Sequence, residues 1–199
     1  MITWEQLRHY FERDSIPYAV EDGRVKVLAA DFRLSGVTLQ LRLVYDAENG
    51  VVAFVVPNLP LPRRLPRTRH ELRRALLTLN SCYILGGFSE NAQGRISFQI
   101  TVPMEGNDLP YHTYRRLLVA ALGSCERALP WLRQVAMGAI SAEEAVESVA
   151  EVSQRLADVH AEQAMPAADA GDDSRGITET EIKEFSRALL DGHIPPPAE

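Results

Sequence analysis

The stretch Thr68–Met104 has the sequence TRHELRRALLTLNSCYILGGFSENAQGRISFQITVPM and contains the signals of a helix, a turn and a strand. Apolar residues recur at steps of three and four at Leu72, Ala75, Leu76, Leu79 and Tyr83. This spacing predicts an amphipathic helix, and Thr68 with Glu71 predicts a capping box at its start. Apolar and polar residues alternate from Ile96 to Val102, which predicts a strand with one buried face.

The residues before this stretch predict one helix and four strands. Thr3 with Gln6 predicts a second capping box and a helix to about Asp14. Turn signals at Asp22-Gly23 and at residues 46–50 then separate alternating apolar runs. The last run, Val51–Val56, is apolar on both faces, so we expect it to be covered on both sides.

The residues after the stretch predict further helices. Asp108 is a candidate cap and Pro110 a first-turn residue of a long helix, which Pro130 is expected to kink near its end. Gly138 separates this helix from another, which begins with a capping box formed by Ser141 and Glu144. In order, these elements predict an α+β fold with an antiparallel sheet, α-β4-α-β2-α, and extra C-terminal helices.

This order resembles the YbjN-type domain, a family of bacterial sensory-transduction regulators related in fold to type III secretion chaperones. The shared features are a helix, Leu79-Asn80, a short strand, a glycine turn, an Ile-x-Phe-x-Ile strand and a long closing helix. The resemblance covers Trp4–Leu132 and is most specific over Leu76–Val102. It implies a compact, often dimeric domain that handles other proteins, and it offers no catalytic residues.

Four segments are predicted along the chain. Residues 1–135 form the α+β domain, and residues 141–164 form an amphipathic helix packed on this body or on a second subunit. An independent coiled coil is the alternative for that helix, because its apolar residues have heptad-like spacing. Residues 165–176 are rich in Ala, Asp, Gly and Pro and predict a flexible linker. Residues 177–199 form an acidic tail with a short helix.

Composition and charge limit the possible functions. No apolar run in the 199 residues approaches the roughly 20 that a membrane helix needs, and the N-terminus has no signal-peptide core. We therefore expect a cytoplasmic protein without a membrane partner. The net charge of −6 divides into +4 for residues 1–140 and −10 for residues 141–199, so a basic body precedes an acidic end.

No pattern of catalytic or metal-binding residues is evident. The histidines have no ligand spacing, and Cys82 and Cys125 are expected to be buried reduced thiols, with a disulfide or redox pair as the alternative. Asp108 and His112 could form an acid–base pair, although capping and exposure explain them as well. We expect no cofactor, no metal and no enzymatic activity; an enzyme without a recognisable motif is an alternative.

Three groups of residues are candidates for binding. The candidate protein-binding surface, with the hydrophobic core as its alternative, is Trp4, Phe11, Val52, Phe54 and Val56. The candidate basic patch is expected to bind an acidic protein, with a solvated face or a nucleic-acid site as the alternatives, and comprises Arg63, Arg64, Arg67, Arg69, Arg73 and Arg74. The candidate tail motif is Ile182, Phe185, Leu189 and Leu190. The sequence thus predicts a homodimeric protein-binding module, chaperone-like or a regulatory adaptor of a bacterial cytoplasm.

Overall fold

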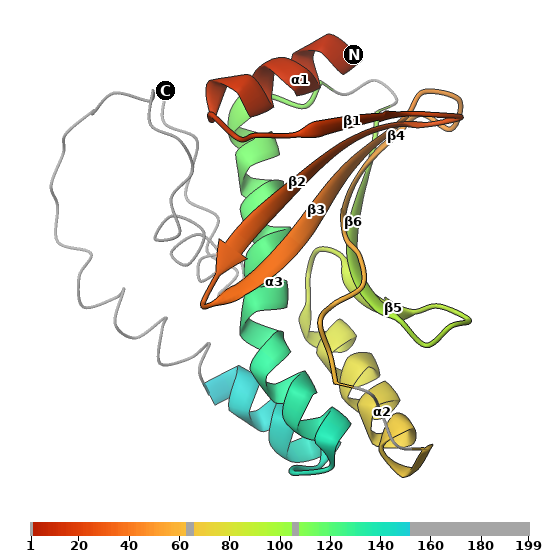
Figure 1. Cartoon of the computed structure of the whole chain (residues 1–199), viewed down its shortest axis with the longest axis vertical. Coiled ribbons are helices and arrows are strands. Elements are labelled where there is room, and N and C mark those ends of the chain that lie inside the picture. The colour runs from red at the N-terminus through yellow and green to blue at the C-terminus, as the bar shows by residue number, and fades with distance from the viewer. Residues whose placement is uncertain (1, 63–65, 105–107, 152–199) are drawn as a thin grey trace, which may run out of the picture.

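Six antiparallel strands form one sheet, and α3 crosses one of its faces (Figure 1). The structure is a computed structural model that describes residues 2–62, 66–104 and 108–151. In chain order the elements are α1 (Trp4–Arg13), β1 (Ala19–Asp22), β2 (Lys26–Leu34), β3 (Val37–Asp46), β4 (Val51–Val56), α2 (Pro66–Cys82), β5 (Gly87–Glu90), β6 (Ile96–Pro103) and α3 (Tyr111–Met137). Residues 142–151 form a fourth helix. The expected α+β class and antiparallel sheet are confirmed.

The strands lie in the spatial order β1-β2-β3-β4-β6-β5. The first four are consecutive neighbours, because each is joined to the next by a turn. β6 then pairs with β4, and β5 pairs with the free side of β6. This order leaves β1 and β5 at the two edges of the sheet.

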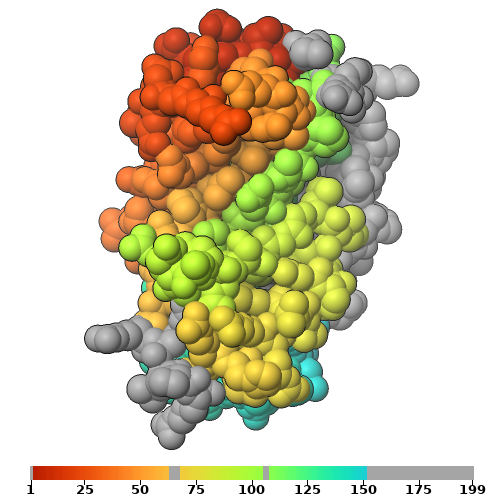
Figure 2. All heavy atoms as spheres, turned by 90° about the vertical axis from the view of Figure 1, so that its right-hand side faces the viewer, coloured from red at the N-terminus to blue at the C-terminus, as the bar shows by residue number. Residues whose placement is uncertain are grey.

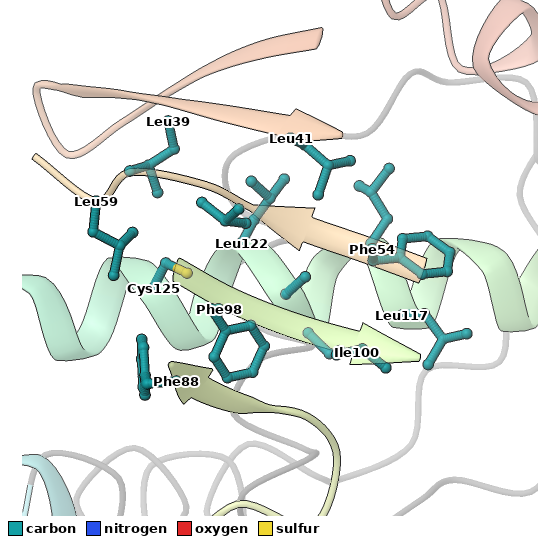
Figure 3. Packing of buried hydrophobic residues seen from close by; sticks show 14 of the residues in the cluster. Leu39, Leu41, Phe54, Leu59, Phe88, Phe98, Ile100, Leu117, Leu122 and Cys125 are labelled. Carbon is teal, nitrogen blue, oxygen red and sulfur yellow. The ribbon is translucent and has the colours of Figure 1, made fainter. Parts of the chain in front are cut away.

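The core lies between one face of the sheet and the helices. Figure 3 shows side chains of β3, β4 and β6, such as Leu41, Phe54 and Ile100, beside Leu117 and Leu122 of α3. All five are less than 9% exposed. Alternation along each strand places every second side chain on this face, which is why the period of two in the sequence identified the strands.

The opposite face of the sheet is mostly polar. Val51 and Val55 of β4 stay partly exposed there, and Val55 lies between Arg42 of β3 and Gln99 of β6. Ala53 is buried by its neighbours because it is small. The expectation that both faces of Val51–Val56 are covered is therefore wrong for the part of the chain that the structure describes.

Two of the expected capping boxes are present and one is absent. The side chains of Thr3 and Gln6 each bond the backbone N–H of the other. Ser141 and Glu144 do the same before residues 142–151. Thr68 does not cap α2, which begins two residues earlier at Pro66. Its hydroxyl is buried and donates to the backbone oxygen of Ala136 at 3.0 Å.

α3 departs from the expected start, and it ends at Gly138, the residue expected to separate it from the next helix. Its N-cap is Pro110, without a side-chain hydrogen bond, so the prediction of Asp108 as the cap is wrong. The helix continues through Pro130 to Met137, and Gly138 ends it with a φ of 75°. The left-handed conformation there is one that glycine adopts at little cost.

The helix that follows Gly138 packs on the rest of the described chain. Ala142, Ala145 and Val149 are buried in the common core, and the N–H of Ala142 donates to the Glu71 carboxylate of α2 at 3.3 Å. Figure 1 shows this helix in cyan beside the C-terminal end of α3. Residues 152–164, which complete the predicted helix, lie outside the described residues. Within the described ranges, no helix is both long and apolar enough to span a lipid bilayer.

Candidate binding groove

A groove of about 490 Å³ lies between the loop after β4, the first turn of α2 and the β5–β6 hairpin. Figure 2 shows α2 and this hairpin together on the face turned toward the viewer. The groove has a partly exposed apolar part, Leu61 and Pro62, above the buried Leu59 and Ile96, and a polar rim that includes Asn58, Arg69 and Arg95. These residues come from three separate parts of the sequence, which only the fold brings together.

The loop after β4 is held against β6 by its backbone. The N–H of Leu59 donates to the backbone oxygen of Ile96 at 2.8 Å, and both side chains are nearly fully buried. Asn58, just before, has a φ of 51°, a left-handed conformation that asparagine tolerates better than most residues. The loop therefore leaves the extended course of β4 at Asn58 and forms one wall of the groove.

The hairpin that forms the other wall is shaped by Asn91. Its side-chain oxygen accepts hydrogen bonds from the backbone N–H groups of Gln93 at 3.0 Å and Arg95 at 2.9 Å. An asparagine side chain that bonds the backbone two and four residues on fixes a tight turn. The Arg95 guanidinium is exposed and donates to the side-chain oxygen of Asn58 at 3.5 Å, so it spans the groove from hairpin to loop.

Two arginines of α2 share one carboxylate of β5. The Arg69 Nε lies 3.2 Å from one oxygen of Glu90, and the Arg73 Nε lies 2.5 Å from the other. Burial raises the pKa of Glu90, but the hydrogen bonds and charges of Arg73 and Arg69 outweigh it, and its pKa lies below the ordinary value. Glu90 therefore stays charged, and the rim retains a net positive charge.

The described polar groups of the groove are suited to binding an anion. Guanidinium groups and amides donate hydrogen bonds to anions, and arginine is suited to carboxylates and phosphates. The nearby carboxylate, Glu90, is held by two arginines, which lowers its basicity. Within the described ranges, no group of three His, Cys, Asp or Glu residues is placed to hold a metal ion.

The candidate protein-binding surface is not a surface of the folded chain. Trp4 is 7% exposed, and Phe11, Val52, Phe54 and Val56 are at most 1% exposed. They lie in the core on the side of the sheet that α1 and α3 cover, where the Phe11 and Phe54 rings both contact the ring of Tyr114. The core alternative is therefore correct for all five residues.

The candidate basic patch divides into two. Arg69 and Arg73 meet at Glu90, whereas Arg74 forms ion pairs with Glu71 and with Glu143 of the following helix. Arg63 and Arg64 lie outside the described residues, as does the side chain of Arg67. The arginines that can be placed are thus each paired with a carboxylate, which reduces the charge available to a polyanion.

Other sequence candidates have no common site. Cys82 is exposed, so the expectation of burial is wrong for this thiol, while Cys125 is buried and burial raises its pKa well above the ordinary value. Both cysteines are free. Asp108 and His112 are exposed near the start of α3. The tail motif, Ile182 to Leu190, lies outside the described residues.

Arg95 is a groove cation that the sequence did not single out. It alternates with apolar residues at the start of a strand, and this pattern predicts only that it is exposed. The signal that could have identified it is the run Asn91-Ala92-Gln93-Gly94-Arg95, a turn that ends in a cation.

The comparisons with protein families, curated proteins and solved structures find no match to this chain.

Proposed function

We propose that this chain is a non-enzymatic protein-binding module, and that its groove binds an acidic, partly apolar segment of a partner protein. The observation that carries the proposal is the pair of guanidinium groups, Arg69 and Arg95, beside the partly exposed apolar side chains of Leu61 and Pro62. Such a groove offers charge-assisted hydrogen bonds to a carboxylate and apolar contact to an adjacent side chain.

Two features favour a protein segment over nucleic acid. Among the described residues no aromatic ring lines the groove, so this part of the chain offers no platform on which a base could stack. Among the arginines whose side chains are described, Arg73 pairs with Glu90, and Arg74 pairs with Glu71 and Glu143, so the positive surface that they form is short. A nucleic-acid site needs a longer row of unpaired cations along the phosphate backbone.

The proposed kind of module is chaperone-like or a regulatory adaptor of a bacterial cytoplasm. The one-sided sheet and the order α-β4-α-β2-α support an arrangement like that of the YbjN-type domain and the type III secretion chaperones. In this proposal the body is a rigid support, and the groove beside the β5–β6 hairpin is where a client segment binds.

The acidic tail of the chain supplies a defined probe. A labelled peptide of Thr178–Pro197 contains acidic residues interspersed with Ile182, Phe185 and Leu189. Its binding to the full chain can be titrated by fluorescence anisotropy. Reversing Arg95 to glutamate should raise the Kd about tenfold or more, because a hydrogen bond to a charged group contributes about 1.5–3 kcal/mol.

Arg24→Glu is the matched control. Arg24 is 84% exposed and pairs with Glu48 in the turns at the far end of β4 from Asn58, so its reversal changes the net charge equally without touching the groove. The peptide's Kd should be unaffected by it. Equal weakening by the two reversals would mean that the groove is not a specific site, as would absence of saturable binding to both the full chain and a chain that ends at residue 164.

A further inference from the structure

One edge of the sheet is open over five residues of β2. β1 pairs with β2 only from Lys26 to Ala29, whereas β2 continues to Leu34. In the described residues no strand pairs with Ala30–Leu34 on the side away from β3. An open strand edge presents unpaired N–H and C=O groups to any strand that can approach.

The β2–β3 hairpin shows which groups these are. Ser35 and Gly36 form its two-residue turn with φ values of 47° and 78°, which is typical of a type I′ turn. The flanking pair, Leu34 and Val37, is then hydrogen-bonded, and hydrogen-bonded pairs alternate along an antiparallel ladder. The backbone N–H and C=O of Phe32 therefore bond to β3. The backbone groups of Asp31 and Arg33 point the other way, toward the open edge of the sheet. The same alternation directs Ala29 outward, where it does pair with β1.

We propose that this edge pairs with the same edge of a second copy of the chain, antiparallel about a two-fold axis at Phe32. This axis places the residue before Phe32 in one copy opposite the residue after Phe32 in the other. Asp31 of each copy therefore lies opposite Arg33 of the other copy. Both are hydrogen-bonded positions, because both residues direct their backbone groups outward. The two sheets become one continuous sheet.

Charge selects this register over its neighbours. A two-fold axis at residue 31 places the two Asp31 side chains opposite each other, and an axis at residue 33 does the same with the two Arg33 side chains. Like charges directly opposite each other destabilise a strand pair, whereas opposite charges stabilise it. The axis at Phe32 is therefore the register that joins both outward-facing residues to a partner of opposite charge.

The side chains at this edge are available for such a contact. Asp31 and Arg33 are exposed on the face of the sheet opposite α3, and neither has an ion-pair partner within the described chain. Ala30 and Leu34 are buried on the other face and Phe32 is partly buried there, so a second copy would extend the apolar layer. The hairpin is also held in place, because the Ser35 hydroxyl donates to Glu126 of α3.

The opposite edge of the sheet, which β5 forms, is closed at Phe88. At β5 both outward backbone groups of Phe88 are bonded by the side chain of Asn80, from α2. The proposed contact lies at the other edge of the sheet from the binding groove. It is therefore independent of the groove's ligand, and the two can be tested separately.

Charge reversal tests the register directly. The full chain, Asp31→Arg and Arg33→Asp are compared by sedimentation and native mass spectrometry, with far-UV circular dichroism to confirm folding. Each single reversal creates two like-charged pairs in a homodimer, because the axis doubles every change. We expect the dimer Kd to rise about tenfold or more in each single variant, as opposed charges become repelling ones.

The recovery experiments are the sharper ones. The double variant Asp31→Arg with Arg33→Asp restores both opposite-charge pairs and should dimerise as the unmodified chain does. Mixing the two single variants should produce a heterodimer, because one copy then carries two arginines and the other two aspartates. Stable dimers form well below about 100 µM. If the unmodified chain is a monomer at that concentration, the proposal is overturned. A dimer that the reversals leave unchanged, or single variants that form no heterodimer, would also overturn it.

Discussion

The side-chain amide of Asn80 takes the place of a neighbouring strand at Phe88. The N–H of Phe88 donates to the amide oxygen of Asn80 at 2.7 Å, and the amide nitrogen donates to the backbone oxygen of Phe88 at 2.9 Å. Both backbone groups of the edge strand at this residue are thereby satisfied from α2. The edge of β5 is closed to a further strand at the point where the Phe88 and Phe98 rings lie 4.9 Å apart.

Asn80→Ala should lower the free energy of unfolding by about 2 kcal/mol, because two partly buried backbone groups lose their partners. Urea unfolding at neutral pH measures this change. Gln40→Ala is the control, since Gln40 is an exposed strand residue and its loss should matter little. The change should also open the β5 edge, so we expect the variant to aggregate at lower concentration. Equal stability of the two variants would show that the Asn80 hydrogen bonds contribute nothing.

Gly86, two residues before Phe88, lies tightly against β6. Gly86 has a φ of 76°, and a Cβ there would lie 2.6 Å from the backbone oxygen of Gln99. Gly36 has a φ of 78°, but a Cβ there would meet nothing within 4 Å. The two positions therefore have the same backbone conformation and differ in the space around them.

Gly86→Ala should consequently destabilise the fold by more than Gly36→Ala. The left-handed conformation costs each alanine roughly 1 kcal/mol, and the clash adds to this only at Gly86. Thermal or urea unfolding of both variants gives the comparison. If both losses are the same, the contact between Gly86 and β6 is not tight in solution.

A buried acid joins α1 to α3. Asp14 is 3% exposed, accepts a hydrogen bond from the Tyr111 hydroxyl and lies 3.7 Å from the Nε of Arg115. The guanidinium of Arg13 lies 3.8 Å from the centre of the Tyr111 ring. Burial first, and then the hydrogen bond to Asp14, raise the pKa of Tyr111 to about 12.

The raised pKa predicts a loss of stability in alkali. The folded chain holds the Tyr111 proton more tightly than the unfolded chain, whose pKa is near 10.0, so the contribution is complete below that pH. It is lost as the pH rises from about 10 toward 12. Tyr111→Phe should lower stability by about 1–3 kcal/mol at pH 7 and should flatten the alkaline decline. Tyr45→Phe, which removes a hydroxyl outside this cluster, should do neither.

The sequence predicted what depends on neighbouring residues. Helices and strands followed from periods of 3.6 and two, and the capping boxes at Thr3 and Ser141 are contacts within four residues. Thr68 was misassigned because the oxygen it bonds, on Ala136, is 68 residues away. A local pattern cannot show that a distant helix end competes for the same hydroxyl.

The candidate site was harder to predict for the same reason. Phe54 and Val56 are equally apolar whether α3 or a partner covers them, and only the packing of α3 decides. The groove joins Asn58, Arg69 and Arg95, which no spacing rule connects. Asn80 is visible in the sequence as a lone amide beside the apolar face of a helix. Its hydrogen bonds to Phe88 cannot be predicted from that pattern, because they depend on the turn that brings β5 back beside α2.

The last prediction concerns the tail as a competitor for the groove. Glu179, Glu181 and Glu184 lie near Ile182 and Phe185, so the segment has the composition proposed for a client. A tethered segment competes at an effective concentration in the millimolar range. We therefore expect the labelled peptide Thr178–Pro197 to bind a chain that ends at residue 164 about tenfold more tightly than the full chain.

The first control is that the shortened chain folds. Its melting temperature should be within a few degrees of that of the full chain, because the composition of residues 165–176 predicts few buried contacts between the tail and the rest of the chain. Phe185→Ala in the full chain should restore tight peptide binding if the apolar side chain supplies most of the docking. Docking by charge alone is largely screened at physiological salt. If apolar contact supplies most of the docking, the difference in peptide affinity between the full and the shortened chain should persist as salt is raised. Equal affinity of the full and shortened chains would show that the tail leaves the groove open, and the groove would then serve partners in other proteins alone.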